Sequence, residues 1–109
     1  MLNRSAVIIG HLPAFHGWLK ASGITDAAME SRNRSAERTI YLIPACEHAD
    51  EIDEVVEDLF EEIFIRELRG WQPDESLWPN DLDVDLFARW FTVEGVSLVD
   101  DLGLSLIHI

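Results

Sequence analysis

The clearest pattern in the chain lies in residues 50–69, where apolar residues recur at the spacing of one face of an α-helix. Six apolar residues fall on one broad stripe: Ile52, Val55, Val56, Leu59, Phe60 and Ile63. Seven acidic residues share the opposite side: Asp50, Glu51, Glu54, Glu57, Asp58, Glu61 and Glu62. The pattern predicts a long amphipathic helix that begins at an N-cap, Asp50, and ends at Gly70. Four residues of the stripe are expected to be buried against a sheet: Ile52, Val56, Leu59 and Ile63.

Shorter patterns flank this helix. Residues 5–10 and 38–44 are β-branched apolar runs of strand length, and residues 92–99 are a third strand candidate in which Gly95 marks a weak point or a bulge. Residues 14–21 and 84–91 carry apolar side chains at helical spacing. This order predicts an α+β fold, a two-layer sandwich in which the long acidic helix covers a three-stranded sheet. A right-handed crossover would make the first two strands parallel.

The length of the chain, 109 residues, fits a single domain. Residues 24–37 are small and polar, and we expect them to form an exposed loop. The last six residues, LSLIHI, resemble the translation of a transposon-end adapter used in preparing sequencing libraries. The domain is therefore expected to cover residues 1–103, and a natural terminal strand at residues 104–109 is the alternative.

The net charge of the chain and the length of its apolar segments indicate which kinds of partner it can bind. The net charge is −13, and the acidic residues are concentrated after residue 38, where 18 of the 21 lie. Such a surface repels nucleic acid and anionic membranes and attracts basic protein surfaces, although solubility alone is the simpler explanation. No apolar run approaches the roughly 20 residues that cross a bilayer. The single Cys46 excludes an internal disulfide, so we expect a cytoplasmic protein.

Four carboxylates are the main candidates for partner binding: Glu54, Glu57, Asp58 and Glu61. Their spacings of three and four residues make them neighbours on one helix face, which suits docking of a basic partner. A solvated face and cation chelation are the alternatives. The chain has no Glu-x-x-His pair and no EF-hand loop, so we predict no metal and no cofactor.

Two histidines are candidates for catalysis. His11 and His48 each follow a predicted strand, and parallel strands would bring both to one edge of the sheet, with Glu47 and Asp50 nearby. Such a group could supply a general base or bind a metal. Because no motif such as HExxH or GxSxG accompanies them, the sequence leaves open whether the protein is an enzyme.

Two tryptophans, Trp71 and Trp78, border a proline-containing segment. Exposed there, they would be anchors for a protein partner or for a homodimer, as aromatic residues are in many interfaces. The alternative is that all four tryptophans of the chain belong to the core.

Several short motifs occur in order along the chain: LNRSA at residues 2–6, YLIP at 41–44, EEIF at 61–64, LWP at 77–79, and Phe87 with WF at 90–91. On these motifs the chain resembles a family of small, acidic, uncharacterised bacterial proteins, from which it departs in its LSLIHI ending. The resemblance implies a bacterial, cytosolic protein and no particular activity. The leading hypothesis is a non-enzymatic module that binds a basic protein surface, and the alternative is a small metal-dependent or His/carboxylate enzyme.

Overall fold

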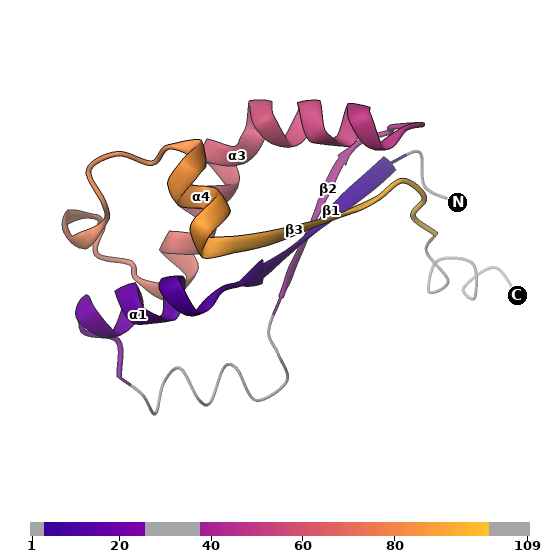
Figure 1. Ribbon diagram of the computed structural model, residues 1–109. Coiled ribbons are helices and arrows are strands. Elements are labelled where there is room, and N and C mark those ends of the chain that lie inside the picture. Colours follow the sequence, from indigo (N-terminus) through magenta and orange to yellow (C-terminus); the bar gives the residue numbers. More distant parts are fainter. Residues whose placement is uncertain (1–3, 26–37, 101–109) are drawn as a thin grey trace, which may run out of the picture.

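The computed structural model describes residues 4–25 and 38–100, which form a sheet, three α-helices and one short 3-10 helix (Figure 1). The elements are β1 (Arg4–His11), α1 (Pro13–Ala21), β2 (Thr39–Pro44), α3 (Ala49–Trp71), η1 (Glu75–Leu77), α4 (Val84–Trp90) and β3 (Phe91–Val96). The predicted α+β class and the long helix are confirmed. The loop expected in residues 24–37 falls almost wholly outside the described residues, as does the tail at residues 104–109.

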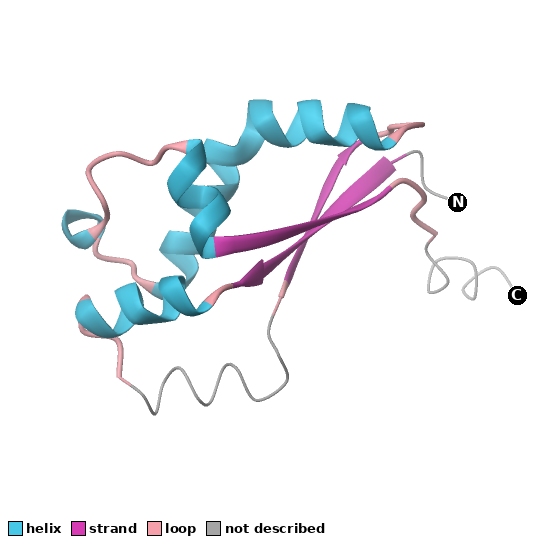
Figure 2. Cartoon of the chain, in the orientation of Figure 1, coloured by secondary structure: helices cyan, strands magenta, loops and turns pink. Residues whose placement is uncertain are grey.

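The sheet has the order β2-β1-β3, and both outer strands run antiparallel to β1. The prediction that the first two strands are parallel is therefore wrong. The reason lies in α1, which does not cross a sheet face but packs beyond the end of β1 (Figure 2). Its Phe15 and Trp18 contact the ring of Trp90 in α4, at centroid distances of 5.6 and 5.1 Å. Because α1 lies beyond the end of β1, the next strand, β2, runs back beside β1 in the opposite direction.

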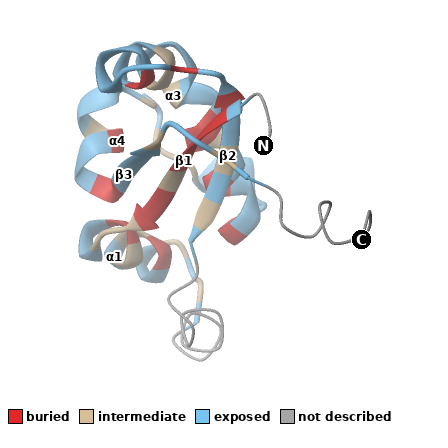
Figure 3. Ribbon diagram, turned by 90° about the vertical axis from the view of Figure 1, so that its right-hand side faces the viewer, coloured by how far each residue is buried: buried red, intermediate tan, exposed pale blue. Residues whose placement is uncertain are grey.

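The core lies between α3 and one face of the sheet. Val7 and Ile9 of the central strand are fully buried, and Phe64 and Leu68 of α3 are buried with them. Figure 3 shows this contrast, with buried positions along β1 and exposed ones along much of β2 and β3. Gly95 forms no bulge, because its pairing with Val7 is in register. A Cβ there would lie 3.0 Å from Ile52, so the glycine allows α3 to approach β3 closely.

The buried stripe of α3 differs from the prediction in its second half. Ile52 and Ile63 are buried as expected, but Leu59 is 38% exposed, so its predicted place in the core is wrong. The buried residues in the later part of α3 are Phe64 and Leu68 instead. The reason is that α3 runs past the sheet and packs its last turns against α4 and the end of β1. Truncation of Leu59 should therefore cost less than the roughly 2–5 kcal/mol of a fully buried leucine.

The ends of α3 also differ by one or two residues from the prediction. Its N-cap is His48, whose side chain makes no capping hydrogen bond, so the assignment of Asp50 as N-cap is wrong. The Glu51 carboxylate instead accepts a hydrogen bond from the Glu47 N–H at 2.9 Å. At the other end the helix continues through Gly70 to Trp71. No helix in residues 4–25 and 38–100 has the length and apolar character needed to span a membrane.

Candidate functional site

The acidic ridge, which we define as Glu54, Glu57, Asp58 and Glu61, lies on the outer side of α3. All four residues are exposed. Within the described part of the chain, none of the four carboxylates forms an ion pair. The neighbouring Glu62 differs, because Arg66 Nε contacts its carboxylate at 2.9 Å. The ridge thus presents a row of negative charges that the described residues leave without counter-charges.

A groove of mixed polar and apolar lining borders the ridge on each side. One groove, of about 350 Å³, lies between α3 and β2, where Leu59 and Ile63 face Tyr41 and Ile43. The other, of about 300 Å³, lies between the first turns of α3 and β3. The grooves carry charged residues beside their apolar ones, Glu62 and Arg66 in the first and Asp53 in the second. The ridge and its grooves together can bind a basic chain that carries apolar side chains.

A buried polar cluster joins three elements at the other end of α3. Glu67 is the centre: His11 Nε2 lies 2.8 Å from its Oε1, and the Tyr41 hydroxyl donates to its Oε2 at 2.5 Å. The side chains of His11 and Glu67 are only 4% and 5% exposed. Because each residue comes from a different element, β1, β2 and α3, the cluster ties the helix to two strands of the sheet.

The electrostatics of the cluster favour a carboxylate at Glu67. Burial raises its pKa, but hydrogen bonds from His11, Tyr41 and Thr39 outweigh that effect, so its pKa is lowered overall. Burial and the bond to Glu67 raise the pKa of the Tyr41 hydroxyl. The carboxylate accepts hydrogen bonds, which places a proton on His11 Nε2. The tyrosine and histidine therefore both act as donors to one anion.

His16 lies beside this cluster. Its ring centroid is 6.0 Å from that of His11. Burial, and then the charge of His11, lower the pKa of His16. His11 Nδ1 and His16 Nε2 are buried atoms with no hydrogen-bond partner among the described residues. The surroundings of His16 are therefore unfavourable for its positively charged form.

The structure does not bring His11 and His48 together, so that predicted pairing is wrong. Because β2 is antiparallel to β1, the last residue of β2, Pro44, pairs with Arg4, at the end of the sheet opposite His11. His48 follows Pro44 and is exposed at the start of α3, with Glu47 and Asp50. In the described ranges, no group of three or more His, Cys, Asp or Glu side chains is arranged to hold a metal ion.

The two tryptophans proposed as anchors are not exposed rings. Trp71 is 6% exposed and packs edge-on to His11, with centroids 5.4 Å apart, so its prediction as an exposed anchor is wrong. Trp78 is half-buried, and its Nε1 donates to the Gln72 carbonyl at 2.7 Å. These rings therefore do not form the exposed tryptophan surface through which a homodimer was expected.

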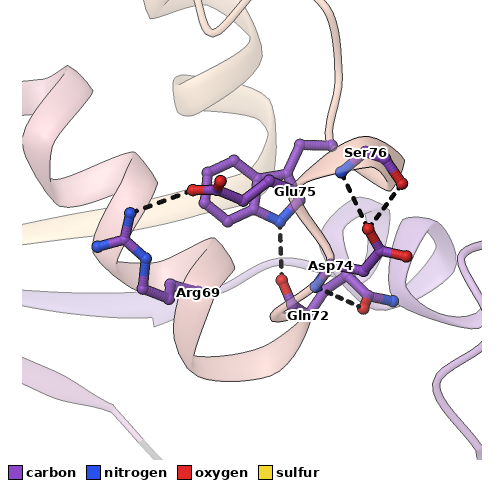
Figure 4. Close-up of polar contacts among 6 residues, drawn as sticks. Arg69, Gln72, Asp74, Glu75 and Ser76 are labelled. Carbon is purple, nitrogen blue, oxygen red and sulfur yellow. Dashed lines mark hydrogen bonds and ion pairs between the residues drawn. The ribbon is translucent and has the colours of Figure 1, made fainter.

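Polar contacts hold the segment around Trp78 (Figure 4). Asp74 caps η1 by accepting from the Ser76 N–H at 3.1 Å, and Arg69 contacts the Glu75 carboxylate at 3.2 Å. The Gln72 side-chain oxygen accepts from the Asp74 N–H at 3.3 Å. These contacts connect the end of α3 to η1 and keep the segment packed on the body of the domain.

The sequence contained a signal for Glu67 that the prediction did not use. Glu67 lies four residues after Ile63 and four before Trp71, on the same face of α3. A carboxylate on an apolar stripe must find buried partners, so this position pointed to a polar cluster. Its partners, His11 and Tyr41, lie far away in the sequence and could not be named.

No protein-family model matches this chain, and comparisons with curated proteins and with solved structures gave no match. The family resemblance drawn from the sequence motifs therefore remains an expectation. Function has to be argued from the acidic ridge, its grooves and the polar cluster.

Proposed function

We propose that this protein is a non-enzymatic interaction module whose acidic ridge binds a basic protein surface. The observation that supports it is the row of four exposed carboxylates without ion-pair partners among the described residues, next to grooves that expose some apolar side chains. The net charge of −13 adds long-range attraction for a basic partner. The resemblance to small bacterial proteins and the absence of disulfide-forming cysteine pairs support a bacterial cytoplasm as its setting.

Magnitudes indicate what such a partner must contain. An exposed ion pair contributes about 0.2–1 kcal/mol, so four pairs with the ridge give only a few kcal/mol. Micromolar binding needs about 8 kcal/mol, and apolar contacts must supply the remainder. The groove beside Leu59 is suited to that, because this leucine is partly exposed at its wall. The proposed partner is therefore a basic segment that also carries apolar side chains.

The alternative is a small His/carboxylate enzyme, and the polar cluster is the observation in its favour. His11 and Glu67 are hydrogen-bonded as a base and its orienting carboxylate would be. However, both side chains are almost fully buried, so a substrate could reach them only after a helix moved. Elemental analysis of the purified protein is a cheap discriminator, since a stoichiometric metal lost in H11N would favour the enzyme.

The test of the interaction module compares two matched double variants. E57Q/D58N removes two charges from the ridge, and D81N/D85N removes two exposed charges elsewhere. Each variant and the wild type are immobilised, exposed to lysate of a bacterial host, and washed in about 50 mM or about 500 mM NaCl. Bound proteins are quantified by mass spectrometry.

We expect a basic protein that is retained by wild type and D81N/D85N, is lost from E57Q/D58N, and dissociates in high salt. Its binding to purified wild type should weaken at least several-fold with L59K, which blocks the groove. Equal retention by both double variants would show that the ridge does not recognise the partner, and the proposal would fail.

A further inference from the structure

Two imidazole nitrogens beside the polar cluster are buried and have no hydrogen-bond partner among the described residues. They are His11 Nδ1 and His16 Nε2, and we call these two residues the histidine pair. The His11 side chain is only 4% exposed, so bulk water does not hydrogen-bond to its Nδ1. Buried side-chain nitrogens are hydrogen-bonded in the large majority of cases, and exceptions often mark a catalytic group, a bound water or a bound ion. The fold itself therefore does not use the bonding capacity of these two atoms.

The turn between β1 and α1 produces the pair. His11 is the last residue of β1, and Pro13 begins α1, where a residue without an N–H is well tolerated. The Leu12 N–H donates to the Trp90 carbonyl at 2.8 Å, which holds the turn in place. His16 follows early in α1, so its ring comes to lie beside that of His11. A metal was not expected from the sequence, because a spacing of five residues across a strand and a helix belongs to no common metal-binding motif.

Glu67 fixes the state of the His11 ring. Its carboxylate can only accept, and His11 Nε2 lies 2.8 Å from its Oε1, so the proton of the neutral ring is on Nε2. The other nitrogen, Nδ1, then carries a free lone pair. Histidines that bind metals are commonly oriented in this way, because a carboxylate that accepts from one nitrogen fixes the tautomer and makes the other nitrogen more basic. The Tyr41 hydroxyl donates to the second oxygen of Glu67 and so holds the carboxylate in turn.

The two rings are close enough to share one ion. Their centroids are 6.0 Å apart, and their planes are inclined at 67°. Zinc binds histidine nitrogens at about 2.0–2.1 Å, and with the radius of each ring added, two rings that share an ion have centroids at most about 6.4 Å apart. The observed distance lies within this limit. His16 is partly exposed, so an ion can approach the pair from the side of α1.

We propose that His11 Nδ1 and His16 Nε2 bind one late first-row transition-metal ion such as Zn²⁺, with Glu67 as the positioning carboxylate behind His11. Imidazole nitrogen suits Zn²⁺, Cu²⁺ and Ni²⁺, whereas Ca²⁺ and Mg²⁺ prefer oxygen ligands. In residues 4–25 and 38–100, no third His, Cys, Asp or Glu side chain completes the site, so water or an external ligand takes the other coordination positions. A site with two side-chain ligands exchanges its ion readily, so the ion has to be added to the purified protein.

This site is separate from the acidic ridge. The pair lies where β1 meets α1, far from the start of α3 (Figure 1). The ridge offers only carboxylate oxygens, which favour hard cations. The buried Glu67 carboxylate, not the ridge, offsets part of the charge of an ion at the pair. Metal binding therefore goes beyond the proposed partner binding, and each can fail independently of the other.

The test uses a background in which the pair is the only source of imidazole. The chain has four histidines, so H48Q/H108Q leaves only His11 and His16. H16Q is then added in this background, and the partial exposure of His16 makes the change compatible with folding, which circular dichroism verifies. E57Q/D58N is the matched control on the ridge. Isothermal titration with Zn²⁺ and with Mg²⁺ measures affinity and stoichiometry, and electron paramagnetic resonance with Cu²⁺ counts the nitrogens bound to the metal.

We expect one Zn²⁺ per chain with a similar Kd in wild type, H48Q/H108Q and E57Q/D58N, and no Mg²⁺ at the pair. H16Q should raise the Kd at least ten-fold and reduce the coupled nitrogens in the Cu²⁺ spectrum from two to one. E67Q should raise the Kd about 10–100-fold while both nitrogens stay bound, as a positioning residue would.

Three results would overturn the site. Zn²⁺ binding that H16Q leaves unchanged would be an adventitious ion only. A loss of binding in E57Q/D58N but not in H16Q would place the ion on the ridge. No Zn²⁺ binding by H48Q/H108Q would mean that the two nitrogens serve no metal, whatever the outcome of the partner-capture experiment.

Discussion

The two halves of α3 use the same side chain in opposite ways. Up to just past its middle, Glu54, Glu57 and Glu61 are exposed and lack ion pairs with other described residues. In the second half, Glu67 is buried and accepts hydrogen bonds from His11 and Tyr41. Glu61 and Glu67 are only six residues apart, a rise of about 9 Å along the axis. Position on the helix, not residue type, decides whether a carboxylate can bind a partner or stabilise the fold.

This contrast has an energetic cause. An exposed carboxylate keeps its water and interacts weakly with its neighbours, so its removal changes little. A buried carboxylate has exchanged water for fixed donors, and its removal leaves those donors without acceptors. The first half of the helix is therefore free to vary for function, while the second half is constrained by stability.

The largest effect is expected at Glu67. E67A leaves the His11 Nε2–H and the Tyr41 hydroxyl buried without an acceptor, and should lower the free energy of unfolding by about 3–5 kcal/mol. The matched variant E57A, on the exposed half of the same helix, should change it by less than about 0.5 kcal/mol. Urea denaturation followed by circular dichroism measures both. Equal losses in the two variants would contradict the distinction between the halves.

The next effect is a pH dependence with two separate windows. Because the pKa of Glu67 is lowered in the folded protein, its contribution to stability is present above about pH 4.5 and is lost as the pH falls through the lowered value. The pKa of His16 is also lowered, by burial and then by His11, so its contribution is present above about pH 6.5 and is lost on acidification.

Single variants separate these windows. Urea melts from about pH 7 to about pH 3 should show that H16Q removes the decline just below pH 6.5, and that E67Q removes the decline below pH 4.5. His16 is only partly buried, so its effect should be the smaller of the two. A wild-type stability that stays flat between about pH 7 and pH 5 would contradict the assignment to His16.

The smallest effect, opposite in sign, is expected on the acidic ridge. Like charges three or four residues apart on a helix destabilise it by about 0.2–0.5 kcal/mol per pair. Neutralising the ridge in E54Q/E57Q/D58N/E61Q should therefore leave stability unchanged or raise it by about 1 kcal/mol. Thermal melts at low salt measure this, and the gain should shrink in about 500 mM NaCl. A clear loss would mean that the ridge carboxylates have structural partners.

Local patterns predicted the elements well. The strands, the three α-helices and their order follow from periodicity, and the exposed acidic face of α3 follows from the side of the helix on which its carboxylates fall. Periodicity is a property of neighbouring residues, so it does not depend on how the elements are arranged. The same local reasoning identified Ile52 and Ile63 as core residues.

The arrangement of these elements in space could not be predicted from local patterns. Whether β2 runs parallel or antiparallel depends on where α1 packs, and α1 is held by aromatic contacts with Trp90, about 70 residues later. The antiparallel direction of β2 separates His48 from His11 and brings Tyr41 to Glu67 instead. The polar cluster also depends on strand register, which a single sequence does not specify.

The central position of β1 has a consequence for synthesis. Ile8 pairs with Glu94, which emerges from the ribosome 86 residues later. At about 5–20 residues per second, β1 waits some 4–17 s for that neighbour, with one edge and much apolar surface open. Pairings this distant also slow folding itself. A nascent chain of this design has a period during which chaperones, or another nascent copy, can bind its first strand.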